Sequence, residues 1–243
     1  MTNERLRAAL LKSAITPDDL ATHVGVDPKT AERWVSQGRT PHRTHRLKTA
    51  QLLEADDAYL WPSTANDPRA NKASQAELVQ FWPARASVPT NVWLELAASA
   101  VESIDLMAFA ASFLHDSLPD FNEHLEDRIR AGVRLRLLLG DPDSEAVETR
   151  GREERIGEGM PARVRLTWSY FEPLIGLGGV EARKHGQTLY ASLFRFDEDL
   201  LVNPHTLGQP ASQSPVFHFR QIPGGRLFRH HMKGFERGWD ASQ

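Results

Sequence analysis

The 243-residue sequence predicts an α+β multidomain protein, in which a small all-α domain precedes a larger α/β domain with a mixed sheet. Three patterns support this prediction. Residues 16–35 hold two short amphipathic helical patterns separated by a glycine. Residues 92–147 alternate helical and strand patterns, which favours parallel strands with helical crossovers. Short strand patterns dominate after residue 160, so we expect the sheet to be mixed.

The first helical pattern begins at Thr16 and ends at Gly25. Thr16 is placed to cap this helix, Asp19 stands in the acidic position of a capping box, and Pro17 takes the first helical position. Gly25 supplies the backbone freedom that ends the helix. A second helix follows, capped by Asp27. The residues expected to face inward are Leu20, Ala21 and Val24 in the first helix and Ala31, Trp34 and Val35 in the second.

Together the two helices predict a helix-turn-helix, the arrangement that sets the second helix into the DNA major groove. Lys29, Thr30 and Arg33 point outward from the first turns of that helix, where recognition helices reach base edges. Arginine and lysine suit guanine, and threonine offers a hydroxyl and a methyl group. We therefore expect base contacts from these side chains. A small helical protein-interaction domain with a solvated basic face is the alternative.

Charge is distributed unevenly along the chain. Residues 1–48 carry 9 Lys and Arg against 5 Asp and Glu, a net of +4, whereas the remaining residues carry 20 against 27, a net of −7. No acidic residue lies between Arg33 and Leu53. We expect this basic segment to be a loop that grips DNA phosphates, which adds affinity without reading sequence. The predicted DNA-binding residues are Thr16, Lys29, Thr30, Arg33, Arg39, Arg43 and Arg46.

The N-terminal segment resembles the helix-turn-helix of xenobiotic-response-element-type (XRE) repressor-like regulators. The matching residues are 20–21, 24–26, 34 and 38–41, followed by 47–53, which is similar to the closing helix of that family. The resemblance covers about the first sixty residues. It implies binding to double-stranded operator DNA by a homodimer, because two half-sites one DNA turn apart give affinity and register together.

Composition excludes several classes of protein. The chain has no cysteine, which excludes disulfides and thiolate metal sites. No apolar run approaches the ~20 residues that span a bilayer, and no signal peptide opens the sequence, so we expect a cytoplasmic protein without a membrane partner. The scattered histidines and acids match no metal-ligand spacing. We therefore predict no metal site and no cofactor.

A small, polar and turn-rich segment separates the two predicted domains. We assign residues 1–62 to the helix-turn-helix domain, 63–79 to a linker and 80–243 to the second domain. Within the linker, residues 73–79 suit a short helix that leads into the second domain. The second domain is large enough to bury a core of its own.

The second domain is expected to begin with alternating helices and strands. The predicted helices are 92–101, 118–131 and one capped by Asp143, and the predicted strands between them are 104–109 and 133–139. Further strands are expected at 164–168, 180–184, 189–194, 200–202 and 216–220, before a closing helix at 227–239.

The run from His185 to His205 resembles the His-x-Lys-x-x-x-x-Asp motif of the phospholipase D superfamily. His185 stands in the place of the nucleophile, but Gln187 replaces the lysine and Ser192 replaces the aspartate. The first half of the domain offers only His115, again without the lysine. Loss of the lysine that holds the phosphate removes electrostatic stabilisation of the reaction. The resemblance therefore implies a binding cleft without catalysis.

Nearly the whole chain resembles actinobacterial regulators that join a helix-turn-helix to a phospholipase-D-like domain of unassigned ligand. The matching residues are 93, 132–134, 138–144, 150–154, 189–190, 195–197, 201–203, 205 and 235–239. The sequence departs from their pattern at Ala191, where Asn is usual, and at residues 109–111, where Tyr-Ala-Gly is usual. The predicted ligand-binding residues are Asp141, His185, Tyr190, Arg195, Asp197, Asn203 and His205.

Two features leave alternatives open. Asp141 follows a buried strand at the place where open α/β sheets bind ligands, yet the same residues suit a simple strand-to-helix turn. Arg150, Arg152 and Arg155 lie beside acidic residues, and they form either a solvated ion-pair face or an anion clamp.

The sequence as a whole predicts a dimeric, sequence-specific DNA-binding regulator that is not an enzyme. Its second domain is expected to sense a small-molecule effector or to mediate dimerisation, and an altered spacing of two DNA-binding heads would change operator affinity. The competing enzyme hypothesis is a DNA-targeted phosphodiesterase or nuclease that depends on His185. A protein-interaction scaffold is the third hypothesis.

Overall fold

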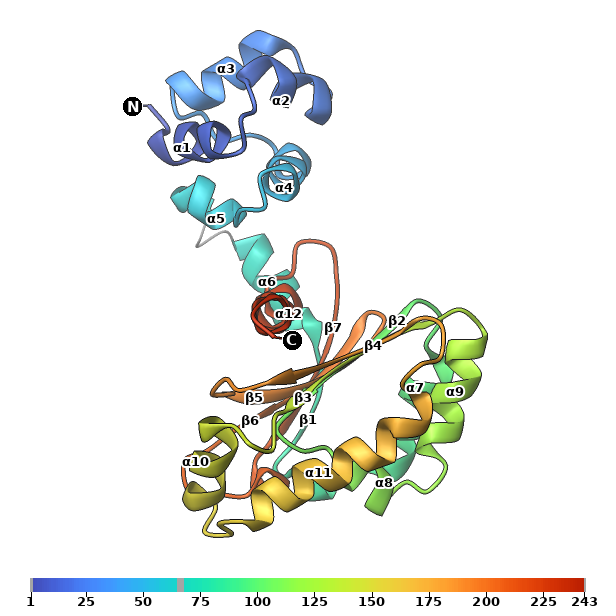
Figure 1. Cartoon of the computed structure of the whole chain (residues 1–243). Coiled ribbons are helices and arrows are strands. Elements are labelled where there is room, and N and C mark those ends of the chain that lie inside the picture. Colours follow the sequence, from blue (N-terminus) through green and yellow to red (C-terminus); the bar gives the residue numbers. More distant parts are fainter. Residues whose placement is uncertain (1, 65–67, 243) are drawn as a thin grey trace. The chain divides into compact units, whose positions relative to one another are not determined.

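The computed structural model describes residues 2–64 and 68–242 and divides the chain into two compact units. The N-terminal unit spans residues 1–73 and the C-terminal unit spans residues 74–243 (Figure 1). Each unit has a hydrophobic core of its own. The first unit is helical and the second contains a seven-stranded mixed sheet, which confirms the predicted fold class.

Short helices surround a small apolar core in the N-terminal unit. They are α1 (Glu4–Lys12), α2 (Pro17–Val24), α3 (Pro28–Ser36), α4 (Arg43–Leu52), α5 (Asp57–Leu60) and the 3-10 turn η1 (Pro62–Thr64). Helix α6 (Pro68–Glu77) follows and continues into the C-terminal unit. The largest side chains of the N-terminal core are Leu6, Leu10, Leu20, Trp34, Leu53, Leu60 and Trp61.

The predicted caps of α2 and α3 are present. The Thr16 hydroxyl accepts a hydrogen bond from the Asp19 N–H at 3.1 Å, and the Asp19 carboxylate accepts one from the Thr16 N–H at 3.0 Å. Gly25 ends α2 in the left-handed region with φ 80°, and Asp27 accepts from the Lys29 N–H at 2.9 Å. These contacts satisfy donors that a helix start leaves unpaired. The predicted helix-turn-helix is thus confirmed as a structural motif.

The segment predicted as a linker is largely helical. Residues 65–67 of this segment lie outside the described residues, and residues 68–77 form α6. Proline at the first helical position and good helix formers after it explain the helix. The buried Glu77 side chain accepts hydrogen bonds from the N–H groups of Leu227 and Phe228 and so caps the last helix of the chain. Residues from 74 onward are therefore part of the C-terminal unit.

One seven-stranded sheet, in the order β1-β7-β6-β5-β2-β3-β4, forms the centre of the C-terminal unit. The strands are β1 (Leu78–Trp82), β2 (Ser103–Ala108), β3 (Arg134–Gly140), β4 (Val180–His185), β5 (Ala191–Phe196), β6 (Asp199–Pro204) and β7 (Val216–Arg220). As predicted, β2 and β3 pair in parallel, and β4 extends this parallel set. Because β5 runs antiparallel to both β2 and β6, the end of β2, the start of β5 and the end of β6 lie at the same end of the sheet.

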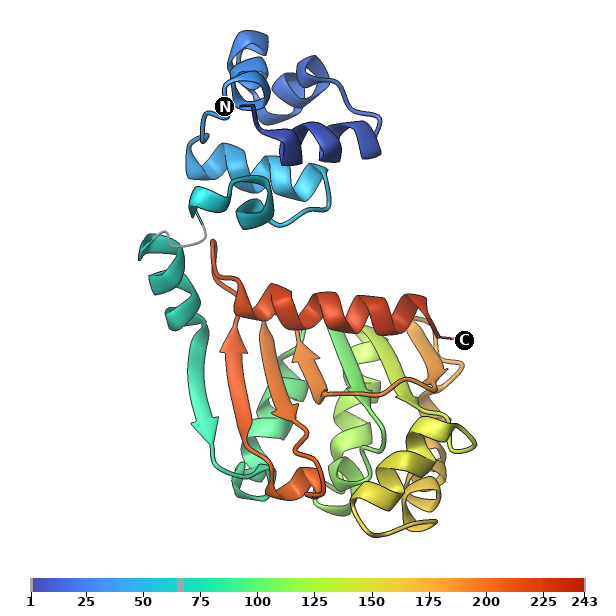
Figure 2. The same ribbon diagram turned by 90° about the vertical axis from the view of Figure 1, so that its left-hand side faces the viewer.

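Helices cover both faces of this sheet (Figure 2). Helix α12 (Leu227–Asp240) lies along one face and buries Phe228, Met232, Phe235 and Trp239. The other face carries α7 (Thr90–Ser99), α8 (Phe113–Asp116), α9 (Phe121–Arg130) and α11 (Gly159–Phe171). Helix α10 (Glu145–Glu153) packs on α11.

Two local predictions are wrong, and one strand, which begins at residues 78–79 where the helix predicted at 73–79 was expected to end, was not predicted. Residues 164–168, predicted as a strand, lie within α11, where Val164, Thr167 and Phe171 are buried at helical spacing. Their β-branched and aromatic side chains favour a strand, but the packing of one helix face overrides that preference. Helix α10 is capped by Ser144 rather than by Asp143. The unpredicted strand is β1, an edge strand that pairs only with β7 among the described strands.

Candidate functional site

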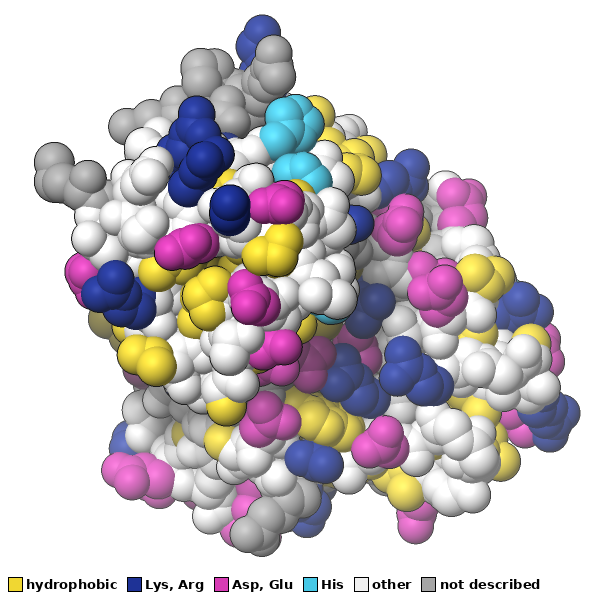
Figure 3. All heavy atoms as spheres, turned by 90° about the horizontal axis from the view of Figure 1, so that it is seen from above, with side chains coloured by type: hydrophobic (Ala, Val, Ile, Leu, Met, Phe, Trp, Pro, Cys, Tyr) yellow, Lys and Arg dark blue, Asp and Glu magenta, His cyan; other side chains and the backbone are white. Residues whose placement is uncertain are grey.

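Helix α3 presents the side chains that the sequence predicts to read DNA bases. Trp34 anchors its buried face in the core of the unit. Lys29 and Arg33 are exposed and lie four residues apart, so they project from the same side of the helix, and Thr30 beside them is partly exposed. Viewed from above, Lys and Arg side chains of this unit gather beside histidine side chains (Figure 3). The helix therefore offers a solvent-facing, basic row of side chains.

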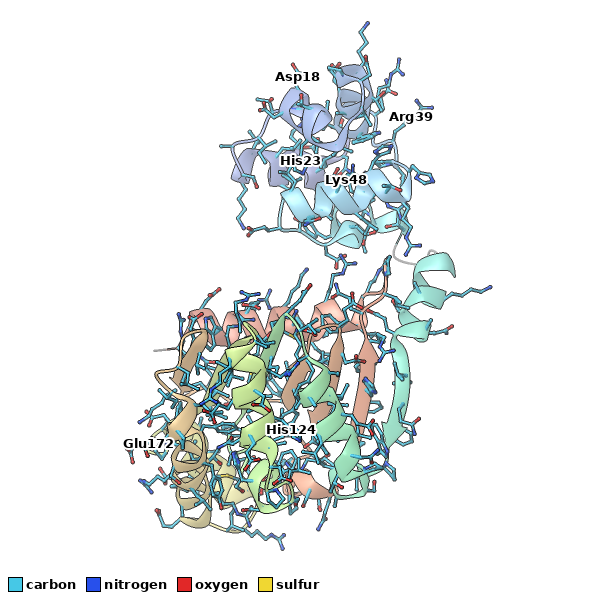
Figure 4. All side chains as sticks on the ribbon, turned by 90° about the vertical axis from the view of Figure 1, so that its right-hand side faces the viewer. Asp18, His23, Arg39, Lys48, His124 and Glu172 are labelled. Atoms are coloured by element: carbon cyan, nitrogen blue, oxygen red, sulfur yellow. The ribbon has the colours of Figure 1, made fainter. Side chains whose placement is uncertain are left out.

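The basic segment after α3 is a loop only in part. Arg39 is exposed in the α3–α4 connection, and Lys48 is exposed on α4 (Figure 4). Arg43 is the first residue of α4 and is partly buried. Arg46 is buried, with its Nε 3.8 Å from the Asp57 carboxylate, because the turn of α4 on which it lies faces the core. The expected phosphate-gripping loop is thus shorter than predicted, and Arg46 stabilises the unit from inside.

Thr16 caps the start of α2. Its hydroxyl donates to Asp19 Oδ2 at 2.6 Å while it accepts from the Asp19 N–H. These hydrogen bonds hold the pKa of the Asp19 carboxyl below its ordinary value. Thr16 is nevertheless exposed, so the start of α2 is accessible from solvent.

In the C-terminal unit, three of the seven predicted ligand residues hold the fold together. Arg195 donates to Asp105 at 2.8 Å, and the same carboxylate accepts from Arg136 at 2.7 Å. Asp197 accepts hydrogen bonds from the backbone N–H groups of residues 101–103. Asn203 is fully buried and donates to two backbone carbonyls between β6 and β7. The charged groups of Arg195 and Asp197 and the amide nitrogen of Asn203 are therefore used inside the fold, whereas Asn203 Oδ1 is buried without a hydrogen-bond partner among the described residues.

Three other predicted residues are close to the strand ends without facing a common space. Asp141 accepts from the Asp143 N–H at 3.3 Å and so forms the simple strand-to-helix turn. His185 is 1% exposed, its Nε2 lies 3.1 Å from the Ala108 carbonyl oxygen, and burial lowers the pKa of its imidazole. Tyr190, by contrast, is 83% exposed. The structure does not assemble these residues into one pocket.

A cavity of about 70 Å³ opens where β2 ends and β5 begins. Of the predicted ligand residues, only His205 is part of its described lining. Arginines from three separate elements also line it: Arg85 from the turn η2 (Arg85–Ser87), Arg150 from α10 and Arg163 from α11. The other lining residues are Phe109, Ala110, Ser112, Phe113, Glu154, Met160, Ser192, Pro210, Ala211 and Ser212.

His205 and Ser192 form a hydrogen-bonded pair in the cavity wall. His205 Nδ1 lies 3.2 Å from the carbonyl oxygen of Leu189, which can only accept, so Nδ1 carries the proton. Nε2 then accepts from the Ser192 hydroxyl at 3.1 Å. Burial, together with the positive charges of Arg150 and Arg85, lowers the pKa of His205 to about 4. His205 is therefore neutral at pH 7.

The depressed pKa of His205 predicts a loss of stability in acid. The unfolded chain takes up this proton near pH 6.5, whereas the folded protein keeps the imidazole neutral down to about pH 4. The stability contribution is thus complete above pH 6.5 and is expected to fall by about 2–3 kcal/mol as the pH drops to about 4. Urea unfolding at a series of pH values should show a shallower fall for His205→Gln. An unchanged pH dependence in that variant would contradict the assignment.

The described residues contain neither a cluster of metal ligands nor a membrane-spanning helix. In residues 2–64 and 68–242, no three His, Cys, Asp or Glu side chains come together as a metal site. Within those ranges, no helix has both the length and the apolar character that a bilayer crossing requires.

Sequence reasoning missed most of the cavity. Arg85 and Arg163 lie in segments without a motif, and only the packing of η2 and α11 brings them together. Arg150 is 5% exposed and pairs with Glu154 at 2.6 Å, so it is not part of a solvated face, whereas Arg152 is exposed. The rule that ligands bind beyond strand ends indicated the end of the sheet at which the cavity lies. The signal was the pattern of strand ends rather than any single residue.

Comparisons with known proteins give distant structural similarities. No protein-family model and no curated protein matches the chain. The solved structure of TrmBL2, an archaeal chromatin protein with a novel mode of DNA binding, is 14% identical with a TM-score of 0.43, covering 90% of this chain and 71% of that one. Nuc, a phospholipase D family member from Salmonella typhimurium, is 14% identical with a TM-score of 0.37, covering 67% of this chain and 93% of that one.

Proposed function

We propose that this protein is a transcriptional regulator that binds operator DNA by setting α3 into the major groove. The observation that carries the proposal is the joint exposure of Lys29 and Arg33 on a helix held rigidly by a capped helix-turn-helix. Such side chains reach guanine edges when the N-terminal part of a recognition helix enters the groove. Thr30 lies on the same turn and is proposed as a further base contact.

Phosphate contacts are proposed for residues that flank α3. Arg39 follows α3, and Arg43 begins α4, so both lie beside the helix that enters the groove. Thr16 stands at the start of α2, and helix N-termini are frequent partners of DNA phosphates. We leave Arg46 out of this surface because its side chain is buried against Asp57.

We further propose a homodimer whose C-terminal unit responds to a small-molecule effector. Helix-turn-helix proteins gain affinity and register by binding two half-sites one DNA turn apart, which supports the dimer. The polar cavity at the end of the sheet supports an effector site in the C-terminal unit. An effector that binds one arrangement of the dimer better than another would shift operator affinity.

We propose that the C-terminal unit binds its ligand without catalysis. His185, the residue in the place of a nucleophile, is buried and its Nε2 is occupied by a backbone carbonyl. His205 lies at the cavity, but a pKa of about 4 makes it a weak base at pH 7. Neither histidine is therefore matched to proton transfer at neutral pH.

A DNA-binding selection on the purified full-length protein tests the proposed function. Random duplexes are enriched, sequenced and re-measured at two salt concentrations. We expect a defined, two-fold symmetric site whose half-sites are about 10–10.5 base pairs apart, centre to centre, or a multiple of that. Binding that is weak, strongly salt-dependent and without sequence preference would leave only a basic surface and overturn the proposal.

A further inference from the structure

The cavity of the C-terminal unit has an excess of positive charge. Arg85, Arg150 and Arg163 line it, against a single carboxylate, Glu154. The Arg150 guanidinium is neutralised by Glu154 at 2.6 Å. Within residues 2–64 and 68–242, neither Arg85 nor Arg163 forms an ion pair with a carboxylate. Two cationic side chains therefore face the cavity without a carboxylate of the described residues at ion-pair distance.

Arg85 is a cation of the cavity wall that has no carboxylate of the described residues at ion-pair distance. Its guanidinium lies 4.0 Å from the centroid of the Phe113 ring, and its backbone N–H donates to the Ser214 carbonyl at 2.8 Å, so its position is fixed. Burial lowers the pKa of this arginine to about 10; the negative charge of Glu154 opposes this shift and the positive charge of Arg163 adds to it. Removing a cation from water without a partner is unfavourable. An anion in the cavity would supply that partner.

The dimensions and the walls of the cavity limit the anion. A cavity of about 70 Å³ is large enough for a tetrahedral oxyanion. Phe109, Phe113 and Met160 add apolar surface against which an organic substituent can pack. The neutral Ser192–His205 pair brings no negative charge to the wall.

We propose that this cavity binds the phosphate group of a small phosphate monoester. Such a group carries a charge of about −1.5 to −2 at pH 7, which balances the two arginines that lack a carboxylate partner. Its oxygens also match the planar donor fork of a guanidinium. Use of this ligand as the effector rests on the proposed regulatory function, whereas phosphate binding by the cavity does not.

Isothermal titration calorimetry of the full-length protein tests the proposal with four probes: phenyl phosphate, inorganic phosphate, dimethyl phosphate and acetate. We expect phenyl phosphate, which is largely dianionic at pH 7, and inorganic phosphate, which is partly dianionic there, to bind at least about tenfold more tightly than the monoanions dimethyl phosphate and acetate. Equal affinity for all four probes would overturn the proposal. So would the absence of phosphate binding by the folded protein.

Substitutions of the cavity arginines test whether phenyl phosphate binds in the cavity. Arg85→Gln and Arg163→Gln are each expected to weaken phenyl phosphate binding by at least about tenfold. Arg165→Gln is the matched control, because Arg165 is an exposed arginine on the same helix as Arg163 but pairs with Asp143 outside the cavity. We expect a change of less than about twofold there. If Arg85→Gln does not fold, the comparison of Arg163→Gln with Arg165→Gln tests the proposal, because Arg163 is exposed. Equal affinities of these two variants for phenyl phosphate would overturn it.

Operator binding measured on the same preparation separates the two proposals. Phenyl phosphate binding without a preferred DNA sequence would reject the regulator and keep the phosphate site. Sequence-specific DNA binding without phosphate binding would reject the phosphate site and keep the regulator.

Discussion

Replacing Asp105 with alanine is expected to destabilise the C-terminal unit by about 3–5 kcal/mol. Asp105 lies on β2 directly between Arg136 on β3 and Arg195 on β5, its register partners on the two neighbouring strands. The carboxylate is 1% exposed and lies 2.7 and 2.8 Å from the two guanidinium groups. Its removal leaves two cations in the middle of the sheet: Arg136 keeps a carboxylate partner, Glu236 on α12, whereas Arg195 keeps only the backbone carbonyl of Asp197 as a hydrogen-bond acceptor among the described residues.

Urea unfolding of the full-length protein measures this loss of stability when the transition of the C-terminal unit is monitored. Asp143→Ala is the matched control, because its carboxylate also meets an arginine, Arg165, at 2.8 Å, but the two side chains are 75% and 55% exposed. An exposed pair of this kind contributes about 0–1 kcal/mol. Equal losses in the two variants would contradict the structural role assigned to Asp105.

Trp34→Ala is expected to unfold much of the N-terminal unit and to abolish DNA binding. Trp34 is 4% exposed and anchors α3 in the core. Truncation of a buried tryptophan costs about 3–5 kcal/mol. That loss is comparable to the whole stability of a unit of this size, about 4–10 kcal/mol. The C-terminal unit has a separate core, so its unfolding transition should stay unchanged.

Thermal unfolding with limited proteolysis, which identifies the fragment that survives, measures the effect of Trp34→Ala. Tyr59→Ala serves as its control, because Tyr59 is an aromatic residue of the same unit that is 52% exposed. Tyr59 contacts Arg5 through its ring face at 5.3 Å, a contact worth no more than about 1 kcal/mol. A Trp34→Ala variant that binds operator DNA like the unmodified protein would contradict the role of this anchor.

The helix-turn-helix could be predicted because its signals are local. The capping box of Thr16 and Asp19 acts across three residues, and Gly25 and Asp27 act at their own positions. The inward side chains follow a helical period that is visible in the sequence. The parallel pairing of β2 with β3 was predictable for a similar reason, since a helix lies between two apolar runs.

The arginine cavity could not be predicted, because tertiary packing alone assembles it. Arg85, Arg150, Arg163 and His205 come from four separate segments, of which only the consecutive helices α10 and α11 are neighbours in the sequence. The burial of Arg46 follows in the same way from Asp57 on a different helix. The resemblance to a known motif directed attention to His185, whereas the pairing of β5 with β6 places Ser192 and His205 side by side.

The affinity of the selected operator, compared with that of a scrambled duplex, tests recognition by α3 most directly. The full-length protein, Arg33→Ala and Arg7→Ala are compared at one salt concentration. Arg7 is the matched control, because it is an exposed arginine on α1 that pairs with Glu4. We predict that Arg33→Ala weakens operator binding by about 1–3 kcal/mol, while its effect on the scrambled duplex and the effect of Arg7→Ala on either duplex stay small. Equal losses on both duplexes, or an unchanged operator affinity in Arg33→Ala, would contradict recognition of DNA sequence by α3.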